Sequence, residues 1–198
     1  ADDNASGTSG LLELAQKLSA NVNSLKRSIL LVGFDAEEKG LLGSNHFVQS
    51  SPIDLKKVTT MINMDMIGRL SDSTLTVGGV GTSPSFEYIL DSLKEKRLFD
   101  LTVNKPGFGP SDHAPFYAKD IPVLFFFSGF HNDYHTPNDT WQKINLKGQK
   151  HILDFIYDLV FHLSRSPNRP TFQESGPKKS QVNEIRNFEV SPKDNAFL

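Results

Sequence analysis

The sequence of 198 residues contains no cysteine, carries little net charge and has no long apolar run. Without cysteine, the chain can form no structural disulfide and offers no thiol nucleophile. Its 21 basic and 23 acidic residues leave a net charge of −2, which gives no basic field for nucleic acid. No segment approaches the roughly 18 apolar residues that a membrane span needs. We therefore expect neither a nucleic-acid partner nor a membrane span in this chain.

The sequence also lacks a serine nucleophile in a recognisable setting. No serine lies in a Gly-x-Ser-x-Gly turn, so hydrolysis through a covalent intermediate has no support from either serine or cysteine. Apolar residues, by contrast, make up 37% of the chain and include 15 phenylalanines, enough for the core of one domain. That domain is predicted to cover residues 1–165. Residues 166–198, rich in proline and charge, are predicted to be a tail or linker.

Short apolar runs alternate with helical patterns along the predicted domain. Strands are predicted at residues 28–34, 57–64, 73–77, 99–104 and 121–127. Helices are predicted after Ser6 or Ser9, at 83–96, after Ser111 or Asp112, and at 146–164. This alternation predicts an α/β fold, a three-layer sandwich with a mostly parallel mixed central sheet and helices on both faces.

Acidic residues and one histidine follow the predicted strands. Glu37 and Glu38 follow the predicted strand 28–34, and Asp65 follows the predicted strand 57–64. His135 lies on the loop after the predicted strand 121–127, and Asp3 precedes the first predicted helix. In open α/β sheets, sites form outside the carboxyl ends of strands, so these side chains are expected to converge on a metal. One of the two adjacent glutamates can then hold the metal while its neighbour moves a proton.

Four motifs in this order make the chain similar to the M28 family of zinc aminopeptidases, with support from Ser111-Asp112-His113-Ala114-Pro115-Phe116. The motifs are Ala1-Asp2-Asp3-Asn4-Ala5-Ser6-Gly7, Asp35-Ala36-Glu37-Glu38-Lys39-Gly40-Leu41-Leu42-Gly43-Ser44, Asn63-Met64-Asp65-Met66-Ile67-Gly68-Arg69 and Tyr134-His135-Thr136-Pro137-Asn138-Asp139-Thr140. The resemblance implies a peptide substrate, two zinc ions in the intact enzyme, and a secreted, periplasmic or lumenal location.

The resemblance also assigns roles to individual residues. It implies that Asp3 bridges the two metals, that Glu38 completes one metal shell, and that Asp65 and His135 each hold a metal. Glu37 becomes the general base, and Tyr134 is expected to donate a hydrogen bond to the oxyanion. The peptide between Asp3 and the next residue is expected to be cis.

One family ligand has no counterpart here. Members of the family carry a further histidine in a His-x-Asp motif upstream of the bridging aspartate, and this sequence begins two residues before Asp3. His131 is interpreted as loop surface, and the other histidines as surface or packing residues: His46, His113, His151 and His162. We therefore interpret the chain as the carboxyl-terminal part of a catalytic domain, with the missing amino-terminal segment as a partner.

Several assignments stay open at this level. Asp112 either caps a helix or, like the favoured Asp139, accepts the second ring proton of a ligand histidine. Arg69 either binds a substrate carboxylate, as in a carboxypeptidase or dipeptidase, or pairs with Asp72. Phe108, Phe127 and Phe130 are candidate walls of an apolar pocket, with ordinary core packing as the alternative for Phe127. The alternative functions are a non-catalytic, receptor-like relative and a single-zinc acyltransferase of the glutaminyl cyclase type.

Overall fold

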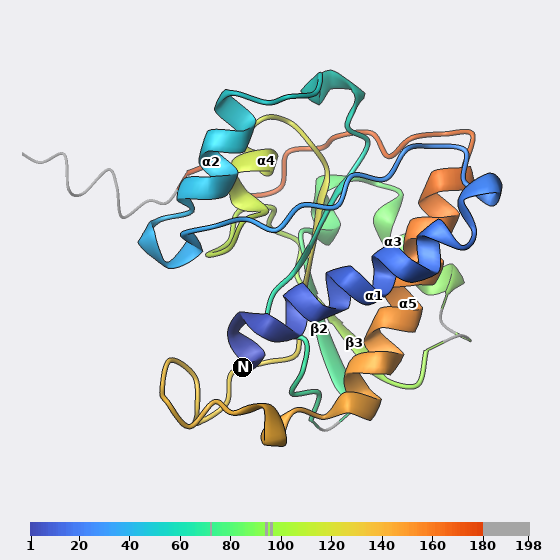
Figure 1. The fold of residues 1–198 in the computed structure, drawn as a ribbon. Coiled ribbons are helices and arrows are strands. Elements are labelled where there is room, and N and C mark those ends of the chain that lie inside the picture. The colour runs from blue at the N-terminus through green and yellow to red at the C-terminus, as the bar shows by residue number, and fades with distance from the viewer. Residues whose placement is uncertain (72, 94, 96, 180–198) are drawn as a thin grey trace, which may run out of the picture.

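A mixed four-stranded sheet forms the centre of the molecule (Figure 1). The structure, a computed structural model, describes residues 1–71, 73–93, 95 and 97–179. The strands are β1 (Met61–Met64), β2 (Thr74–Gly78), β3 (Asp100–Val103) and β4 (Val123–Phe127), in the order β1-β4-β2-β3. β1 runs parallel to β4 and β2 parallel to β3, whereas β2 and β4 are antiparallel. The sheet is therefore mixed, as predicted.

Helices cover both faces of this sheet. They are α1 (Gly7–Ser19), α2 (Leu42–Gln49), α3 (Phe86–Ser92), α4 (Ala114–Tyr117) and α5 (Leu146–Arg165). Leu124 and Phe126 of β4 pack in one apolar cluster with α1, α3 and α5, whereas Val123 packs in a second cluster with α2 and α4. Because successive residues of a strand point to opposite faces, the two clusters lie on opposite sides of the sheet. The predicted three-layer α/β fold is thus confirmed.

The helix α5 shows how the sequence fixes these layers. Its apolar residues recur at helical spacing, so that Ile152, Phe155 and Leu159 are buried on one face. Its first turn is capped by Asn145, whose side-chain oxygen accepts a hydrogen bond of 2.9 Å from the backbone N–H of Gly148. The prediction of a long helix at 146–164 agrees with the observed bounds to within one residue.

The strand predicted at residues 28–34 is wrong. This segment leads to the two glutamates, but it is not part of the sheet, and the side chains of Leu30 and Leu31 are 55% and 39% exposed. An apolar, β-branched run becomes a strand only where a neighbouring strand takes up its backbone hydrogen bonds. Among the described residues, β1 pairs with β4 alone, and 28–34 does not pair with its other edge.

Part of the predicted tail packs against the domain. The backbone N–H of Gln173 donates to the carbonyl of Thr82 at 2.8 Å, and that of Ser175 donates to the hydroxyl of Tyr117 at 2.8 Å. Phe172 packs against the second apolar cluster. Residues 180–198 lie outside the described residues, as do two positions of the helix predicted at 83–96. Within the described part of the chain, no helix is long and apolar enough to cross a membrane.

Candidate metal and catalytic site

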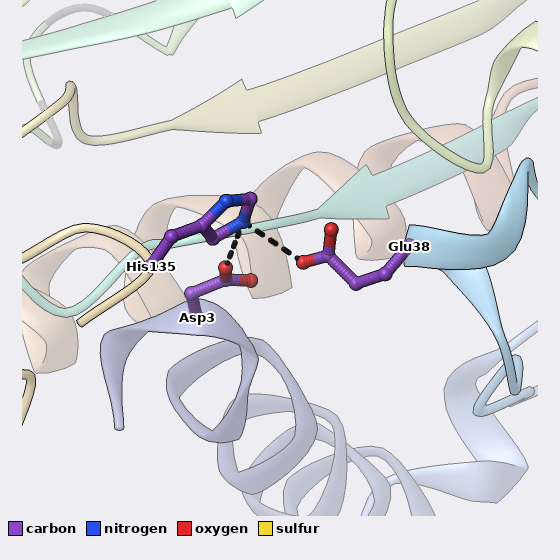
Figure 2. Close-up of side chains that lie close together, drawn as sticks. All are labelled: Asp3, Glu38 and His135. Carbon is purple, nitrogen blue, oxygen red and sulfur yellow. Dashed lines mark hydrogen bonds and ion pairs between the residues drawn. The ribbon is translucent and has the colours of Figure 1, made fainter. Parts of the chain in front are cut away.

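Three side chains from distant parts of the sequence meet beyond the sheet (Figure 2). The His135 Nε2 atom lies 3.0 Å from Asp3 Oδ2 and 3.0 Å from Glu38 Oε1. Asp3 precedes α1, Glu38 lies in the short 3-10 turn Glu37–Lys39, and His135 lies in the loop between β4 and α5. One ligand atom from each side chain lies within 4.8 Å of the other two. We call Asp3, Glu38 and His135 the triad.

Asp3 is held in place by the segment around it. The peptide bond between Asp3 and Asn4 is cis, which confirms the expectation from the resemblance. The Asn4 side chain donates to the Met64 carbonyl at 3.1 Å and accepts from the Met66 N–H at 3.2 Å, which fastens this segment to the end of β1. Gly7 is required here, since a Cβ atom would come within 2.4 Å of the Met64 carbonyl oxygen.

Asp65 lies directly after β1, as predicted, but it is not one of the three residues of the triad. Its Oδ2 atom accepts a hydrogen bond of 2.8 Å from Ser111 Oγ, and Ser111 Oγ accepts one of 2.7 Å from Asn63 Nδ2. Burial, together with the charge of Asp3, raises the pKa of Asp65 to about 6, although the Ser111 hydrogen bond acts in the opposite sense. Sequence reasoning missed the role of Ser111, despite its position in the Ser-Asp-His motif.

Glu37 and Glu38 occupy different environments. Burial and then the charges of Asp65, Glu38 and Asp112 raise the pKa of Glu37 to about 7. The Glu38 side chain is 58% exposed and contacts His135. A carboxylate with a pKa near neutrality can accept and return a proton at physiological pH. The two neighbouring glutamates thus differ in burial and in the charges that surround them.

Tyr134 lies against the ring of His135. The two rings stack with centroids 3.7 Å apart, and Phe130 contacts Tyr134 edge-on at 5.0 Å. Burial, reinforced by the surrounding carboxylates, raises the pKa of Tyr134 above its ordinary value. Its hydroxyl is therefore protonated at neutral pH and available as a donor.

The helix-cap interpretation of Asp112 is wrong. Helix α4 begins after His113 without a side-chain cap, and the carboxylate of Asp112 hydrogen-bonds Ser44 instead. His113 is a packing residue, because its ring is buried and stacks on Phe125 at 4.6 Å. Burial lowers the pKa of His113 to about 4, so this ring is neutral at physiological pH.

His131 is not a surface residue, contrary to the sequence interpretation. Its side chain is 14% exposed, and its Nε2 atom lies 3.3 Å from Oδ2 of the fully buried Asp2. The other oxygen of Asp2 accepts a 2.7 Å hydrogen bond from the Gly68 N–H. Sequence reasoning missed both residues. The signal for Asp2 was its place beside Asp3 in the first motif.

Asp139 does not support His135 in the predicted way. Burial favours its neutral form, but hydrogen bonds from the chain's amino group, the Asp3 N–H and Arg69 outweigh this and hold the pKa of Asp139 well below its usual range. Arg69 pairs with Asp133 at 3.2 Å and with Asp139 at 3.0 Å. The alternative partner Asp72 lies outside the described residues.

Comparisons with known proteins show the family of the chain. The family model described as "Peptidase family M28" matches residues 1–160, and the chain belongs to this family. Aminopeptidase YwaD of Bacillus subtilis is 31% identical over 180 residues, which cover 86% of this chain and 39% of that protein. The chain thus spans less than half the length of this relative.

Solved structures share the fold. The LapA aminopeptidase of Legionella pneumophila matches with a TM-score of 0.75 and 26% identity, covering 85% of this chain and 47% of LapA. BSAP, a zinc aminopeptidase from Bacillus subtilis, matches with a TM-score of 0.71 and 28% identity, covering 89% of this chain and 45% of BSAP. Both similarities extend over most of the described chain.

Proposed function

We propose that this chain carries the zinc site of an aminopeptidase, which removes amino-terminal residues from peptides. The observation that carries the proposal is the meeting of Asp3, Glu38 and His135 beside Glu37, a carboxylate whose pKa is raised to about 7. Family membership supports the same activity. Similarity to BSAP, a zinc aminopeptidase, supports zinc as the metal.

The residues present fit zinc. Two carboxylates and one imidazole form a donor set typical of catalytic zinc, which uses three protein ligands and leaves a position open. We propose that the triad holds one ion, and that Asp3 and Asp65 hold a second. When bound, such ions polarise a carbonyl group and lower the pKa of water. We expect the second ion to bind more weakly to this chain, because two carboxylates alone make a poorer shell than a set that includes imidazole.

The chain's own side chains take roles that follow from their environments. Glu37 accepts the proton of the attacking water and passes it to the leaving amine, since its pKa lies near neutrality. The Tyr134 hydroxyl donates a hydrogen bond to the oxygen that becomes negatively charged. No covalent intermediate with the protein is required.

The aromatic residues next to the triad provide a candidate pocket for the first side chain of the substrate. Phe127 contacts Phe130 at 4.9 Å, and Phe130 contacts Tyr134 at 5.0 Å, so the row ends beside His135. Phe130 is 72% exposed and free to contact a ligand. Phe108 packs against the second apolar cluster instead. We propose a preference for apolar amino-terminal residues.

Metal stoichiometry and substrate choice together test the proposed function. When the chain is loaded with zinc and then dialysed, it should retain one tightly held ion, and it should take up a second ion at higher zinc concentration. It should cleave an aminoacyl nitroanilide but not the N-acetylated form of that substrate. Joining a segment with the family's His-x-Asp motif to the amino end should raise both the second zinc occupancy and the activity.

The same measurements separate the alternatives. Absence of zinc binding even with the added segment would favour the receptor-like alternative and contradict the proposal. A single ion with cyclisation of amino-terminal glutamine would favour the cyclase type. Cleavage at the carboxyl end of a peptide would identify a carboxypeptidase.

A further inference from the structure

The carboxylate of Asp139 connects the two ends of the triad. Its Oδ2 atom accepts hydrogen bonds from the backbone N–H groups of Asp2 at 2.7 Å and Asp3 at 3.1 Å. It also accepts one from the amino group of Ala1 at 2.5 Å. Asp139 lies four residues after His135, and its side chain is only 6% exposed. The backbone that presents Asp3 is therefore fixed by the loop that presents His135.

The guanidinium of Arg69 completes this connection. The Arg69 Nη2 atom donates to Asp139 Oδ1 at 3.0 Å and to Asp133 Oδ2 at 3.2 Å. The Arg69 side chain is 14% exposed. Asp133 and Asp139 lie on either side of His135 in the sequence, so one guanidinium holds both limbs of the loop. The Arg69 backbone N–H also donates to Ser128 Oγ at 3.2 Å, at the end of β4.

We propose that Arg69 and Asp139 form a positioning pair that sets the separation of Asp3 and His135, and so the affinity of the triad for its metal. Neither side chain needs to touch metal or substrate. The inference rests on the proposed zinc site. It adds that the ligands at positions 3 and 135 are positioned by one shared ion pair.

Charge and burial explain why an arginine is suited to this place. One nitrogen of the planar guanidinium, Nη2, contacts both carboxylates. The rigid plane holds this nitrogen in a fixed direction, which a lysine ammonium on a flexible stem does less well. Removing the guanidinium leaves Asp133 and Asp139 without this cation, close to the negative charges of the triad. Asp133 keeps its ion pair with Lys143 at 2.6 Å, and Asp139 keeps the N–H groups of Asp2 and Asp3, but Asp139 Oδ1 loses its Arg69 donor. Because a hydrogen bond lost from a largely buried carboxylate is costly, the loop is expected to move until water replaces the donor.

A partly buried arginine elsewhere provides a matched control. Arg27 donates to the carbonyls of Leu163 at 2.9 Å and Ser166 at 2.5 Å, at the end of α5. Arg27→Met should therefore destabilise the fold without disturbing the triad. Arg69→Met and Asp139→Asn break the proposed pair. Arg69→Lys keeps the positive charge but loses the planar guanidinium group.

Two measurements on the full chain test the proposal. The first is amide hydrogen exchange of the metal-free protein, followed in peptides that cover residues 1–6, 131–140 and 160–166. The second is zinc affinity by competition with a chelator, together with the visible spectrum of the cobalt-loaded protein, which reports ligand geometry. We expect Arg69→Met and Asp139→Asn to speed exchange at 1–6 and 131–140, to weaken zinc binding about 10–100-fold and to change the cobalt spectrum.

The controls determine how each result is interpreted. Arg27→Met should speed exchange at 160–166 and leave zinc affinity unchanged. Arg69→Lys should have an exchange rate at 131–140 and a zinc affinity between those of the wild type and Arg69→Met. The lysine variant also tests the proposal if the methionine variant does not fold. Unchanged exchange at 131–140 in Arg69→Lys and Asp139→Asn, or equal loss of zinc affinity in Arg27→Met, would overturn the positioning role. If the wild type binds no metal, the proposed function fails, and local exchange changes would still support the pair.

Discussion

The two halves of the candidate site differ in how their charges are balanced. In the triad, the His135 ring lies between the carboxylates of Asp3 and Glu38, and the side chains of His135 and Glu38 are 47% and 58% exposed. On the other side, Glu37, Asp65 and Asp112 are all acids, and burial raises the pKa of each. Burial and the charge of Glu38 also raise the pKa of Asp3, but His135 acts in the opposite sense. The first half therefore balances its acids with an imidazole, whereas the second half holds acids alone.

This difference gives two adjacent glutamates separate roles. Glu37 and Glu38 share one short turn, and both are acids of the same size. Their environments separate them, because Glu37 faces other carboxylates in a less solvated place while Glu38 contacts a histidine. Under the proposed function, the first transfers the proton and the second binds the metal.

The largest effect is expected from Glu37→Gln. The amide cannot accept a proton, so turnover of an aminoacyl nitroanilide should fall roughly 10²–10⁴-fold, the usual range for losing general acid-base catalysis. Zinc content should stay close to that of the wild type, since Glu37 is not part of the triad. Activity near the wild-type level, or loss of the metal, would show that the two glutamates were assigned in the wrong order.

Glu38→Gln is expected to lower turnover less than Glu37→Gln does, and to weaken zinc binding directly. Replacing the carboxylate with an amide removes the charge of one triad ligand, so the zinc dissociation constant should rise about tenfold or more. Excess zinc should restore much of the activity, which distinguishes this variant from Glu37→Gln. Chelator competition measures the affinity. Unchanged affinity would remove Glu38 from the metal shell.

The same two glutamates show what sequence alone could predict. The carboxyl ends of predicted strands and the four motifs pointed to Asp3, Glu38 and His135, and the structure brings them together. The strand predicted before Glu37, however, is absent. Residues 57–64 and 28–34 have similar apolar patterns, but only the first contains a strand that pairs with β4. An apolar pattern indicates a preference for burial, whereas a strand also requires an adjacent strand to take up its backbone hydrogen bonds.

Contacts between distant loops were beyond the reach of sequence patterns. Asp139 was expected to support the His135 ring, but its oxygens accept from backbone N–H groups more than 130 residues away and from Arg69. His131 was expected at the surface, yet it faces the buried Asp2. Such pairings depend on how loops pack, and a single sequence carries no periodic signal for them.

The smallest expected effect concerns pH and the metal-free chain. The folded-state pKa of Glu37, about 7, lies above its ordinary value of 4.5 because of burial and the carboxylates of Asp65, Glu38, Asp112 and Asp3. The folded state therefore holds this proton more tightly than the unfolded state. The resulting stability is fully present below pH 4.5 and is lost as pH rises through 7. Asp65, with a pKa of about 6, acts in the same direction.

His113 also makes stability depend on pH: because its folded-state pKa is about 4, the fold loses stability as pH falls from 6.5 to 4. Comparing the wild type with Glu37→Gln separates the contribution of Glu37 from that of His113. That term is common to both proteins and cancels in the difference. In chelator, urea unfolding should show the glutamine variant gaining stability relative to the wild type between pH 4.5 and 8, while the exposed control Glu13→Gln should show no such trend. Zinc should reduce the difference, because a cation beside these acids favours their charged forms. A pH-independent difference between Glu37→Gln and wild type would mean that the acids on this side of the site do not repel one another, and the contrast between the two halves would fail.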